Sequence, residues 1–272
     1  MYRGGYYGPE PRAFHFPTVG RTVKWLIGIT VGVFLVQVFY AASTGRSLSL
    51  YLGVVPGAVV ERLWVWQVFT YMFLHSPRHF FHIVMNMLLL YWFGTELERL
   101  YGRRRFLTLY LGGGIAGGLA YAATQYLART ALPAIGASAA VMAVLVVYAI
   151  HFPNRIILLF FLIPMPVKWF VVMMIGIDLV YSLTTYADGI AHTAHLGGAL
   201  FGYLFWRFGP SLERFLDGLE DRRRERVVRR RAREQERLDE ILAKISREGF
   251  DSLSRREREF LKSQSAERRG RG

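Results

Sequence analysis

The chain has 272 residues, is 53% hydrophobic, carries a formal net charge of +14 and contains no cysteine. Long charge-free runs at this apolar content exclude an ordinary soluble globular protein, since about 20 apolar residues are enough to cross a bilayer. The lack of cysteine excludes disulfides and a thiol nucleophile.

Taken in chain order, residues 1–20 are rich in Gly, Tyr, Pro and Arg and are expected to form a loose cytoplasmic leader. Six apolar segments then follow, and each is predicted to be a transmembrane helix: 23–41, 79–97, 106–127, 135–152, 167–186 and 190–208. The first segment lacks a small-residue cleavage site, so we expect it to be retained. The fold class is therefore all-α, with a polytopic membrane domain over residues 21–208.

Basic residues fix the expected topology of these six segments. They precede the first segment, separate the second from the third and the fourth from the fifth, and follow the sixth. The positive-inside rule then places both termini in the cytoplasm, as an even number of spans requires. We expect a multi-pass protein of the plasma (inner) membrane.

Two connections between the segments are unusually apolar. Ile156–Ile163 runs into Pro164–Pro166, which breaks a helix, so we expect an interfacial connector there. The loop 42–78 lies outside and carries Trp64 and Trp66. Because Trp favours the membrane interface, the loop is predicted to lie on or in the outer leaflet. A packed loop without a functional role is the alternative.

The tail 209–272 differs in kind, because it holds 19 of the 34 basic and 14 of the 20 acidic residues. A soluble helical tail is predicted from two apolar stripes: Leu212, Phe215, Leu216 and Leu219, then Leu238, Ile241, Leu242 and Ile245. A basic helix beside a membrane is typical of contact with anionic lipids, and a cytoplasmic partner is a further possibility. Interspersed acidic residues argue against nucleic acid.

The end of the tail carries helix stop and start signals. Gly249 is predicted to end one helix, and Ser254 with Glu257 forms a capping box for the last one. Four apolar residues are in position to close a small helical hairpin: Phe250, Leu253, Phe260 and Leu261.

Polar residues inside the apolar segments are the strongest functional signal. Burying Ser138, His195, His82 and Asn86 in hydrocarbon is costly unless they partner one another. Segments two, four and six all run from outside to inside. At 1.5 Å per residue, Asn86, Ser138 and His195 lie roughly 10, 5 and 8 Å below the outer surface. We therefore expect these groups to meet in one layer.

Chemistry assigns their roles. Ser138 is the candidate nucleophile, and His195 is the base that takes its proton and later returns it to the leaving amine. His82 and Asn86 stand four apart on one helix face and would donate hydrogen bonds to the oxyanion, together with the backbone amide of Ser138. Gly198, within Gly-x-x-x-Gly, supplies the flat face that lets two helices approach.

No carboxylate is expected to orient His195. Asp188 lies near the helix mouth and Asp178 lies inside the fifth segment, so a dyad is predicted rather than a triad. A zinc site formed by His82, His192 and His195 is a rival, but no nearby carboxylate or cysteine completes it. We expect no metal and no other cofactor.

These residues resemble the rhomboid family of intramembrane serine proteases over most of residues 21–208. The motifs that carry the resemblance are Gly136-Ala137-Ser138, Ala194-His195-Leu196-Gly197-Gly198 with Gly202, His82-x-x-x-Asn86, and the segment from Phe93 to Gly102. The resemblance implies a six-helix bundle with a water-filled cavity that opens outward. It implies a serine endopeptidase with Ser138 as nucleophile, His195 as base, and His82 and Asn86 as oxyanion donors.

The resemblance also implies single-span or polytopic membrane proteins as substrates, cut within or just outside their transmembrane segments. Loop 42–78 would be the family's membrane-embedded first loop, and the fifth helix with the 186–190 loop would be gate and cap. A catalytically inactive rhomboid-like protein that binds membrane clients is the alternative, and a small transporter is a third. The segment Leu238–Ala266 resembles a helical module at the end of some bacterial rhomboid-like proteins.

Three positions depart from the family pattern. Ala139 stands where a second glycine is common, and its methyl is expected to tighten the contact between the fourth and sixth helices. Met142 replaces an aromatic residue that often stacks on the catalytic histidine. Trp66-Gln67 occupies the position of a Trp-Arg dipeptide. None of these changes removes a catalytic group.

Overall fold

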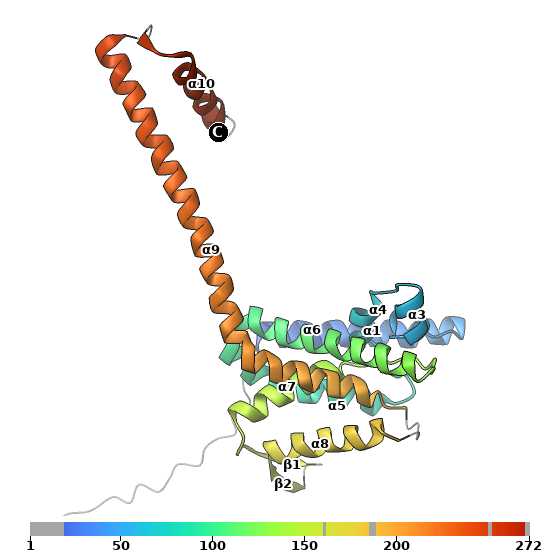
Figure 1. The fold of residues 1–272 in the computed structure, drawn as a ribbon. Helices are drawn as coiled ribbons and strands as arrows, with labels where there is room; N and C mark the ends of the chain where they lie inside the picture. The colour runs from blue at the N-terminus through green and yellow to red at the C-terminus, as the bar shows by residue number, and fades with distance from the viewer. Residues whose placement is uncertain (1–18, 160–161, 185–188, 250–251, 270–272) are drawn as a thin grey trace, which may run out of the picture. The chain divides into compact units, whose positions relative to one another are not determined.

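The computed structural model describes residues 19–159, 162–184, 189–249 and 252–269, except for the side chains at 210, 212–234, 237 and 263–269 (Figure 1). Contacts divide the chain into two compact units, Met1–Arg207 and Phe208–Gly272, and each is described by itself. Nearly all of the leader predicted at 1–20 lies outside the described residues.

The first unit is mostly helical, as predicted. Its elements are α1 (Arg21–Thr44), α2 (Ser49–Leu52), α3 (Pro56–Glu61), α4 (Gln67–Thr70), η1 (Tyr71–Phe73), α5 (Phe80–Leu89), η2 (Leu90–Gly94), α6 (Thr95–Leu127), α7 (Ser138–His151), α8 (Val167–Ser182) and the start of α9 (His192–Glu248). Each predicted segment overlaps a helix. By length and composition, α1 and the stretch Phe80–Leu127 can each cross a membrane, and α7 is a shorter apolar helix.

A kink at Gly102 separates the second and third predicted segments. Helix runs on both sides of this residue, which has φ 72° and ψ 169°. This left-handed φ favours glycine, because other residues meet a steric penalty from Cβ. The boundary between the two segments is therefore a sharp bend at one residue rather than a loop.

The apolar connector after α7 is a β-hairpin. Strands β1 (Ile156–Leu159) and β2 (Ile163–Pro166) pair antiparallel, with Ile156 opposite Pro166. Helix is absent here, as the prolines predicted, but the segment is an ordered ladder. Both prolines of β2 are tolerated because a two-stranded sheet has only edge strands.

Helix α7 lies at the centre of the core. Every residue from Ala139 to Ala149 is buried, as expected for a helix that is apolar on all sides. Its close neighbour is α6, where a Cβ on Gly113 or Gly117 would overlap the methyl of Ala143 or Ala139. Small residues on both helices thus hold α6 against α7.

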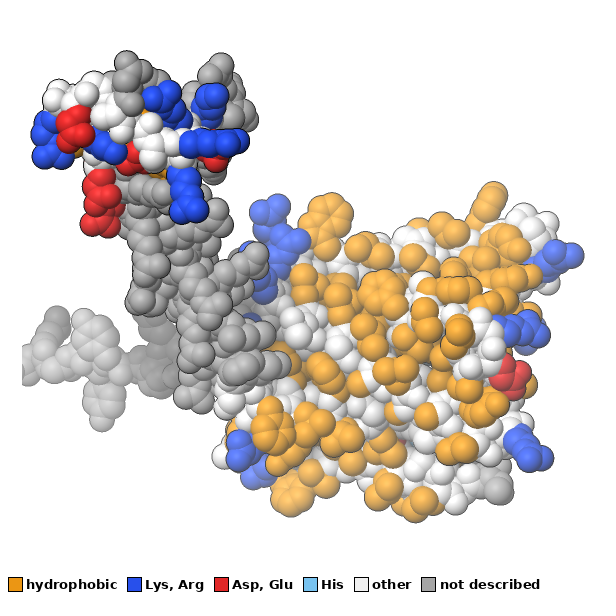
Figure 2. All heavy atoms as spheres, turned by 45° about the horizontal axis from the view of Figure 1, so that its top comes forward, with side chains coloured by type: hydrophobic (Ala, Val, Ile, Leu, Met, Phe, Trp, Pro, Cys, Tyr) orange, Lys and Arg blue, Asp and Glu red, His pale blue; other side chains and the backbone are white. Residues whose placement is uncertain are grey.

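The outer surface of the first unit is strongly apolar. Trp25, Leu35 and Phe39 of α1 are exposed, as are Leu179 and Leu183 at the end of α8. Figure 2 shows hydrophobic side chains covering the visible face of this unit, with Lys and Arg gathered at its ends. A large exposed apolar surface marks contact with lipid or protein.

Glu98 caps the first helix from a distant part of the chain. Its Oε1 accepts the N–H of Thr22 at 2.9 Å and its Oε2 accepts the N–H of Val23 at 3.0 Å. Two of the helix-terminal donors that lack intrahelical partners are thereby satisfied, by an anion at the positive end of the helix dipole. A Cβ on Gly20 would overlap this carboxylate.

The loop between α1 and α5 is internally packed around Gln67, which is fully buried. Gln67 Oε1 accepts the N–H of Val55 at 3.0 Å, and Nε2 donates to the carbonyls of Leu50 and Tyr51 at 3.1 and 3.2 Å. The amide therefore ties three backbone groups together. The position of the whole loop on or in the outer leaflet stays a prediction.

The second unit ends with the predicted stop and start signals. Gly249, with φ 83°, donates its N–H to the carbonyl of Ile245 at 2.9 Å after the last residue of α9. The capping box of α10 (Arg255–Arg269) is formed: Ser254 N–H donates to Glu257 Oε2 at 2.7 Å, and Glu257 N–H donates to Ser254 Oγ at 3.3 Å. Both predictions are confirmed.

The hairpin of the second unit closes on a few apolar side chains. Leu238, Ile241 and Leu253 are buried, and Lys244 Nζ lies 3.2 Å from Glu257 Oε2. The side chains of the stripe Leu212, Phe215, Leu216 and Leu219, and the whole of Phe250, lie outside the described part of the chain.

Candidate active site

Ser138 is the first residue of α7. Gly136, just before it, has φ 127° and donates its N–H to the carbonyl of Tyr71 at 3.0 Å. A Cβ on Gly136 would lie 2.8 Å from Cε1 of His82. The helix therefore starts three residues later than the predicted segment 135–152, because Gly136 is left-handed. At this start, backbone N–H groups lack intrahelical acceptors.

His195 lies in the first turn of α9, which packs closely on α7. A Cβ on Gly198 would overlap the carbonyl oxygen of Ala139, and one on Gly202 would lie 2.6 Å from the carbonyl oxygen of Ala143. The predicted Gly-x-x-x-Gly contact is thus formed. It brings the first turns of the two helices together.

Ser138 and His195 are in hydrogen-bond contact. Ser138 Oγ lies 2.7 Å from His195 Nε2, a distance typical of a hydroxyl donating to a neutral imidazole. The histidine is almost fully buried and the serine is half-buried. The structure therefore brings together the two residues that were predicted to act as nucleophile and base.

His82 and Asn86 lie on α5, opposite this pair. Asn86 Nδ2 donates to the backbone carbonyl of His82 at 2.9 Å. A side-chain amide carries two N–H donors, so one remains for a ligand. The His82 ring lies 5.0 Å from that of His75, centroid to centroid.

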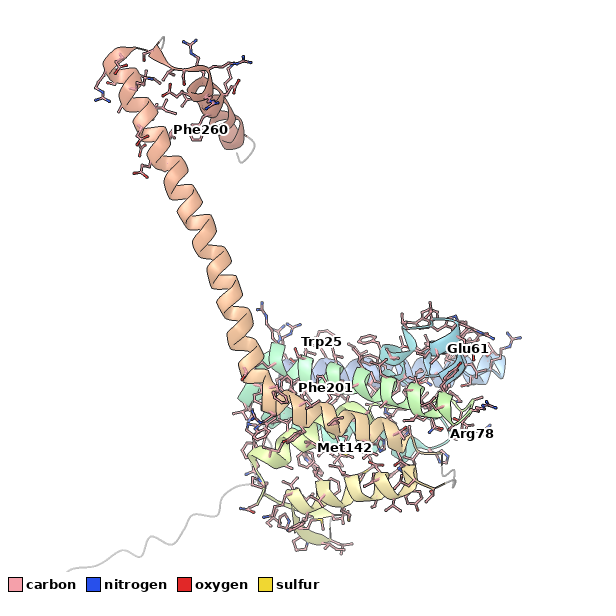
Figure 3. The ribbon with its side chains drawn as sticks, viewed as in Figure 1. Trp25, Glu61, Arg78, Met142, Phe201 and Phe260 are labelled. Atoms are coloured by element: carbon pink, nitrogen blue, oxygen red, sulfur yellow. The ribbon has the colours of Figure 1, made fainter. Side chains whose placement is uncertain are left out.

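A cavity of about 200 Å³ joins all four predicted residues. Its walls come from α5, α7, α8 and α9, and they are formed by Phe81, His82, Met85, Asn86, Leu89, Ser138, Val141, Met142, Leu145, Met174 and His195. Met142 is labelled in Figure 3, within the bundle. A larger depression, of about 850 Å³, lies between the first loop and the end of α6 and contains none of the predicted site residues.

The departures from the family pattern have local explanations. The methyl of Ala139 faces Gly117 on α6, whereas the contact with Gly198 is made by the Ala139 backbone. The expectation that this methyl tightens the fourth and sixth helices is therefore wrong. Met142 is buried and lines the cavity, and Gln67 satisfies backbone groups at both ends of its amide.

One prediction about the base is also wrong, because a carboxylate does contact His195. Asp178 Oδ1 on α8 accepts the Nδ1–H of His195 at 2.9 Å and the Nδ1–H of His192 at 2.7 Å. Asp178 is 2% exposed. An ionisable group inside an apolar helix marks a functional site by default, and that signal was present in the sequence. Asp188 lies outside the described residues.

The rival zinc site does not take the predicted form. Among the described residues, the ligand atoms of Asp178, His192 and His195 lie within 4.8 Å of one another, and His82 is not part of this group. Both imidazoles donate Nδ1–H to the carboxylate, so each nitrogen that faces Asp178 holds a proton. The expectation that no nearby carboxylate completes the set is wrong, because Asp178 lies beside both histidines.

His75 supports the turn before Ser138 and was not singled out from the sequence. Its Nε2 accepts the N–H of Ala137 at 3.5 Å, and Gln37 Oε1 accepts the backbone N–H of His75 at 3.0 Å. Burial, and then the nearby His82, lower the pKa of His75 to about 3. The ring is therefore neutral and keeps its acceptor nitrogen.

Comparison with known proteins gives the class. Residues 62–211, more than half of the chain, match the rhomboid domain, and residues 225–267 match a family of unknown function. The chain belongs to the rhomboid family and is a membrane protein of that class.

Three relatives illustrate the similarity. RHOMBOID-like protein 12, mitochondrial, of Arabidopsis thaliana is 34% identical over 139 residues, covering 46% of this chain and 41% of the relative. Rhomboid protein 1, mitochondrial, of Saccharomyces cerevisiae is 36% identical over 149 residues, covering 51% and 41%. The human presenilin-associated rhomboid-like protein, mitochondrial, is 28% identical over 203 residues, covering 71% and 49%. The chain spans less than half the length of each of these relatives.

Proposed function

We propose that this protein is an intramembrane serine protease that cleaves membrane-protein substrates. The observation that carries the proposal is the 2.7 Å hydrogen bond between Ser138 Oγ and His195 Nε2, at the edge of a cavity. Membership of the rhomboid family supports it. The apolar surface of the first unit also supports it, since the substrate would reach the site from lipid.

The chemistry follows from the placement of the protons. His195 donates its Nδ1–H to Asp178, so Nε2 is free to accept the hydroxyl proton of Ser138. Ser138 Oγ then forms a bond to the scissile carbonyl carbon, and its proton passes to His195 and on to the leaving amine. In the second half of the reaction, His195 takes a proton from water as the water oxygen bonds to the acyl carbon. The bond from that carbon to Ser138 Oγ then breaks, and Oγ recovers the proton from His195.

Charge that develops on the carbonyl oxygen needs donors at the site. We assign that role to the backbone N–H of Ser138 and to the side chains of Asn86 and His82, which share its cavity. Donors fixed in advance stabilise the oxyanion most strongly in a site that excludes water. Each donor removed is expected to lower kcat by about 100- to 1,000-fold.

The membrane arrangement that fits this activity has six spans, with both termini in the cytoplasm and the site near the outer side. The fifth span, α8, and the 186–190 loop would act as gate and cap, although residues 186–188 lie outside the described part of the chain. The cavity lining supports a gate on α8, because Met174 forms part of its wall. The partners are the lipid bilayer and the substrates, with the tail on anionic lipid or a cytoplasmic protein.

We propose the plasma membrane as the location. The mitochondrial names of the three relatives make a mitochondrial membrane the competing location. Cell fractionation of the tagged, full-length protein decides between the two. Protease accessibility of each terminus in sealed vesicles tests the topology separately.

A fluorophosphonate probe tests the activity. In detergent micelles, the wild-type protein should be labelled covalently, and Ser138→Ala and His195→Ala should not. Ser43→Ala, which changes a serine at the end of α1, is the matched control and should label like the wild type. A wild-type protein that stays folded but never labels would overturn the protease proposal in favour of a client-binding protein.

Cleavage itself is read by comparing the membrane proteomes of cells that carry wild type and Ser138→Ala. New chain ends confined to the wild type, within or beside transmembrane segments, are expected. Identical profiles, or solute flux that survives Ser138→Ala, would contradict the proposal.

A further inference from the structure

The carboxylate of Asp178 is buried within hydrogen-bond distance of the imidazole of His195. It lies on α8, in a part of the helix where Ile177, Leu179 and Val180 are exposed, yet it is itself 2% exposed. The helix thus turns one acidic residue inward among apolar ones. Isolated carboxylates are too costly to bury in such surroundings unless they are paired.

The pairing is directed at His195. Asp178 Oδ1 accepts the Nδ1–H of His195 at 2.9 Å, and the opposite ring nitrogen lies 2.7 Å from Ser138 Oγ. A carboxylate, an imidazole and a hydroxyl therefore form one hydrogen-bonded line across α8, α9 and α7. Within the described residues, Oδ2 of Asp178 has no hydrogen-bond partner, so its bonds go through Oδ1.

We infer that Asp178 is a positioning residue that extends the Ser138–His195 pair to a hydrogen-bonded triad. It fixes the tautomer with the proton on Nδ1 of His195, and it stabilises the imidazolium that forms when Ser138 attacks. No proton passes to Asp178 in this scheme; it moves only between Ser138, His195 and the leaving amine. This inference rests on the proposed protease activity.

His192 helps to hold the carboxylate of Asp178 in place. Its Nδ1–H also donates to Asp178 Oδ1, at 2.7 Å, and its ring stacks on Tyr181 with centroids 4.9 Å apart. The carboxylate oxygen is thereby held between two imidazoles, which limits its rotation. When His192 is changed, the hydrogen bond between Asp178 and His195 remains. We therefore expect His192 to contribute less to the rate than Asp178.

Asp178→Asn is the central test, because it keeps the size of the side chain and removes the charge. Labelling by the fluorophosphonate probe and cleavage of a transmembrane reporter substrate are measured across pH. We expect kcat to fall by about 100- to 10,000-fold, with little change in KM and in the thermal unfolding midpoint. A residue that only ties α8 to α9 would lower stability and leave the rate per folded molecule unchanged.

The pH profile separates the two roles further. The ionisable groups around His195 among the described residues are Asp178 on α8, His192 on α9 and His82 on α5. If the charge of Asp178 stabilises the protonated imidazole of His195, the acid limb of the pH–rate profile should move to lower pH in Asp178→Asn. A purely structural tie between α8 and α9 would leave that limb where it is. Asp178→Glu should recover part of the activity.

His192→Phe serves as the matched variant, because it keeps a ring for Tyr181 and removes one donor. It should lower kcat far less than Asp178→Asn. An active wild type that depends on Ser138, together with an Asp178→Asn variant of equal kcat and unchanged pH profile, overturns this inference alone. A wild type with no Ser138-dependent reaction overturns the proposed function instead.

Discussion

The carbonyl oxygen of Ala139 lies where the side chain of residue 198 would begin. A Cβ on Gly198 would overlap that oxygen, so the backbone of α7 touches the backbone of α9 directly after Ser138 and about one turn beyond His195. The short hydrogen bond between Ser138 and His195 depends on this contact, because a helix separated by one methyl would move the imidazole away from the hydroxyl.

Replacing Gly198 by Ala should therefore damage the site. Overpacking in a filled core costs about 1–3 kcal/mol, and a displacement of about 1 Å can lower a rate roughly 100-fold. We expect a lower thermal midpoint and a loss of probe labelling. Gly28→Ala on α1 is the control, because its Cβ would meet nothing within 4 Å; equal behaviour of the two variants would contradict the prediction.

Ala139→Gly should not increase activity, although it restores the residue common in the family. The methyl packs against Gly117 on α6 rather than against α9, so its removal leaves the contact with Gly198 as it is. Glycine inside a helix is less favourable than alanine by about 1 kcal/mol. A lower unfolding midpoint with an unchanged cleavage rate is expected, and a faster variant would contradict this account.

Gln67→Arg should destabilise the first loop, even though arginine is the family residue there. The guanidinium has donors only, so the N–H of Val55 would lose its acceptor and a charge would be buried. An unsatisfied buried group costs about 1–3 kcal/mol. Trp66→Phe, which removes one hydrogen bond from a half-exposed ring to the carbonyl of Tyr51, should have a smaller effect on the melting temperature.

The neutral state of His75 predicts a loss of stability in acid. Burial lowers the pKa of this histidine from 6.5 to about 3, so between these values the unfolded chain binds a proton that the folded chain does not. Stability should fall as pH drops through that window, by up to about 1.4 kcal/mol per pH unit from this group.

The slope of the unfolding free energy against pH is the measurement. His75→Gln should flatten this slope between pH 6.5 and 5, whatever its effect on absolute stability. His79→Gln removes an exposed histidine of the same loop and serves as the control. A slope that His75→Gln does not change would show that other groups set the acid sensitivity.

Much of this arrangement could be predicted from the sequence, since apolar length gives the helices and polar residues within them stand out. Ser138 and His195 are predictable from the sequence because three segments with the same expected direction carry polar groups at a similar expected depth. The contact of Asp178 with His195 was not predicted, because α8 is apolar on most sides and its pattern does not tell which side faces the core. The partners of Gln67 were also beyond prediction, as they lie up to 17 residues away in an irregular loop.

The contact between Glu98 and the start of α1 limits where the N-terminus can be altered. It holds the amides of Thr22 and Val23 and leaves no room for a side chain at Gly20. The start of α1 is thus held in place by Glu98. Tags, fusions and truncations of the leader should end before residue 20, and a cut only a few residues further on would release the start of α1 from Glu98 in the first turn of α6.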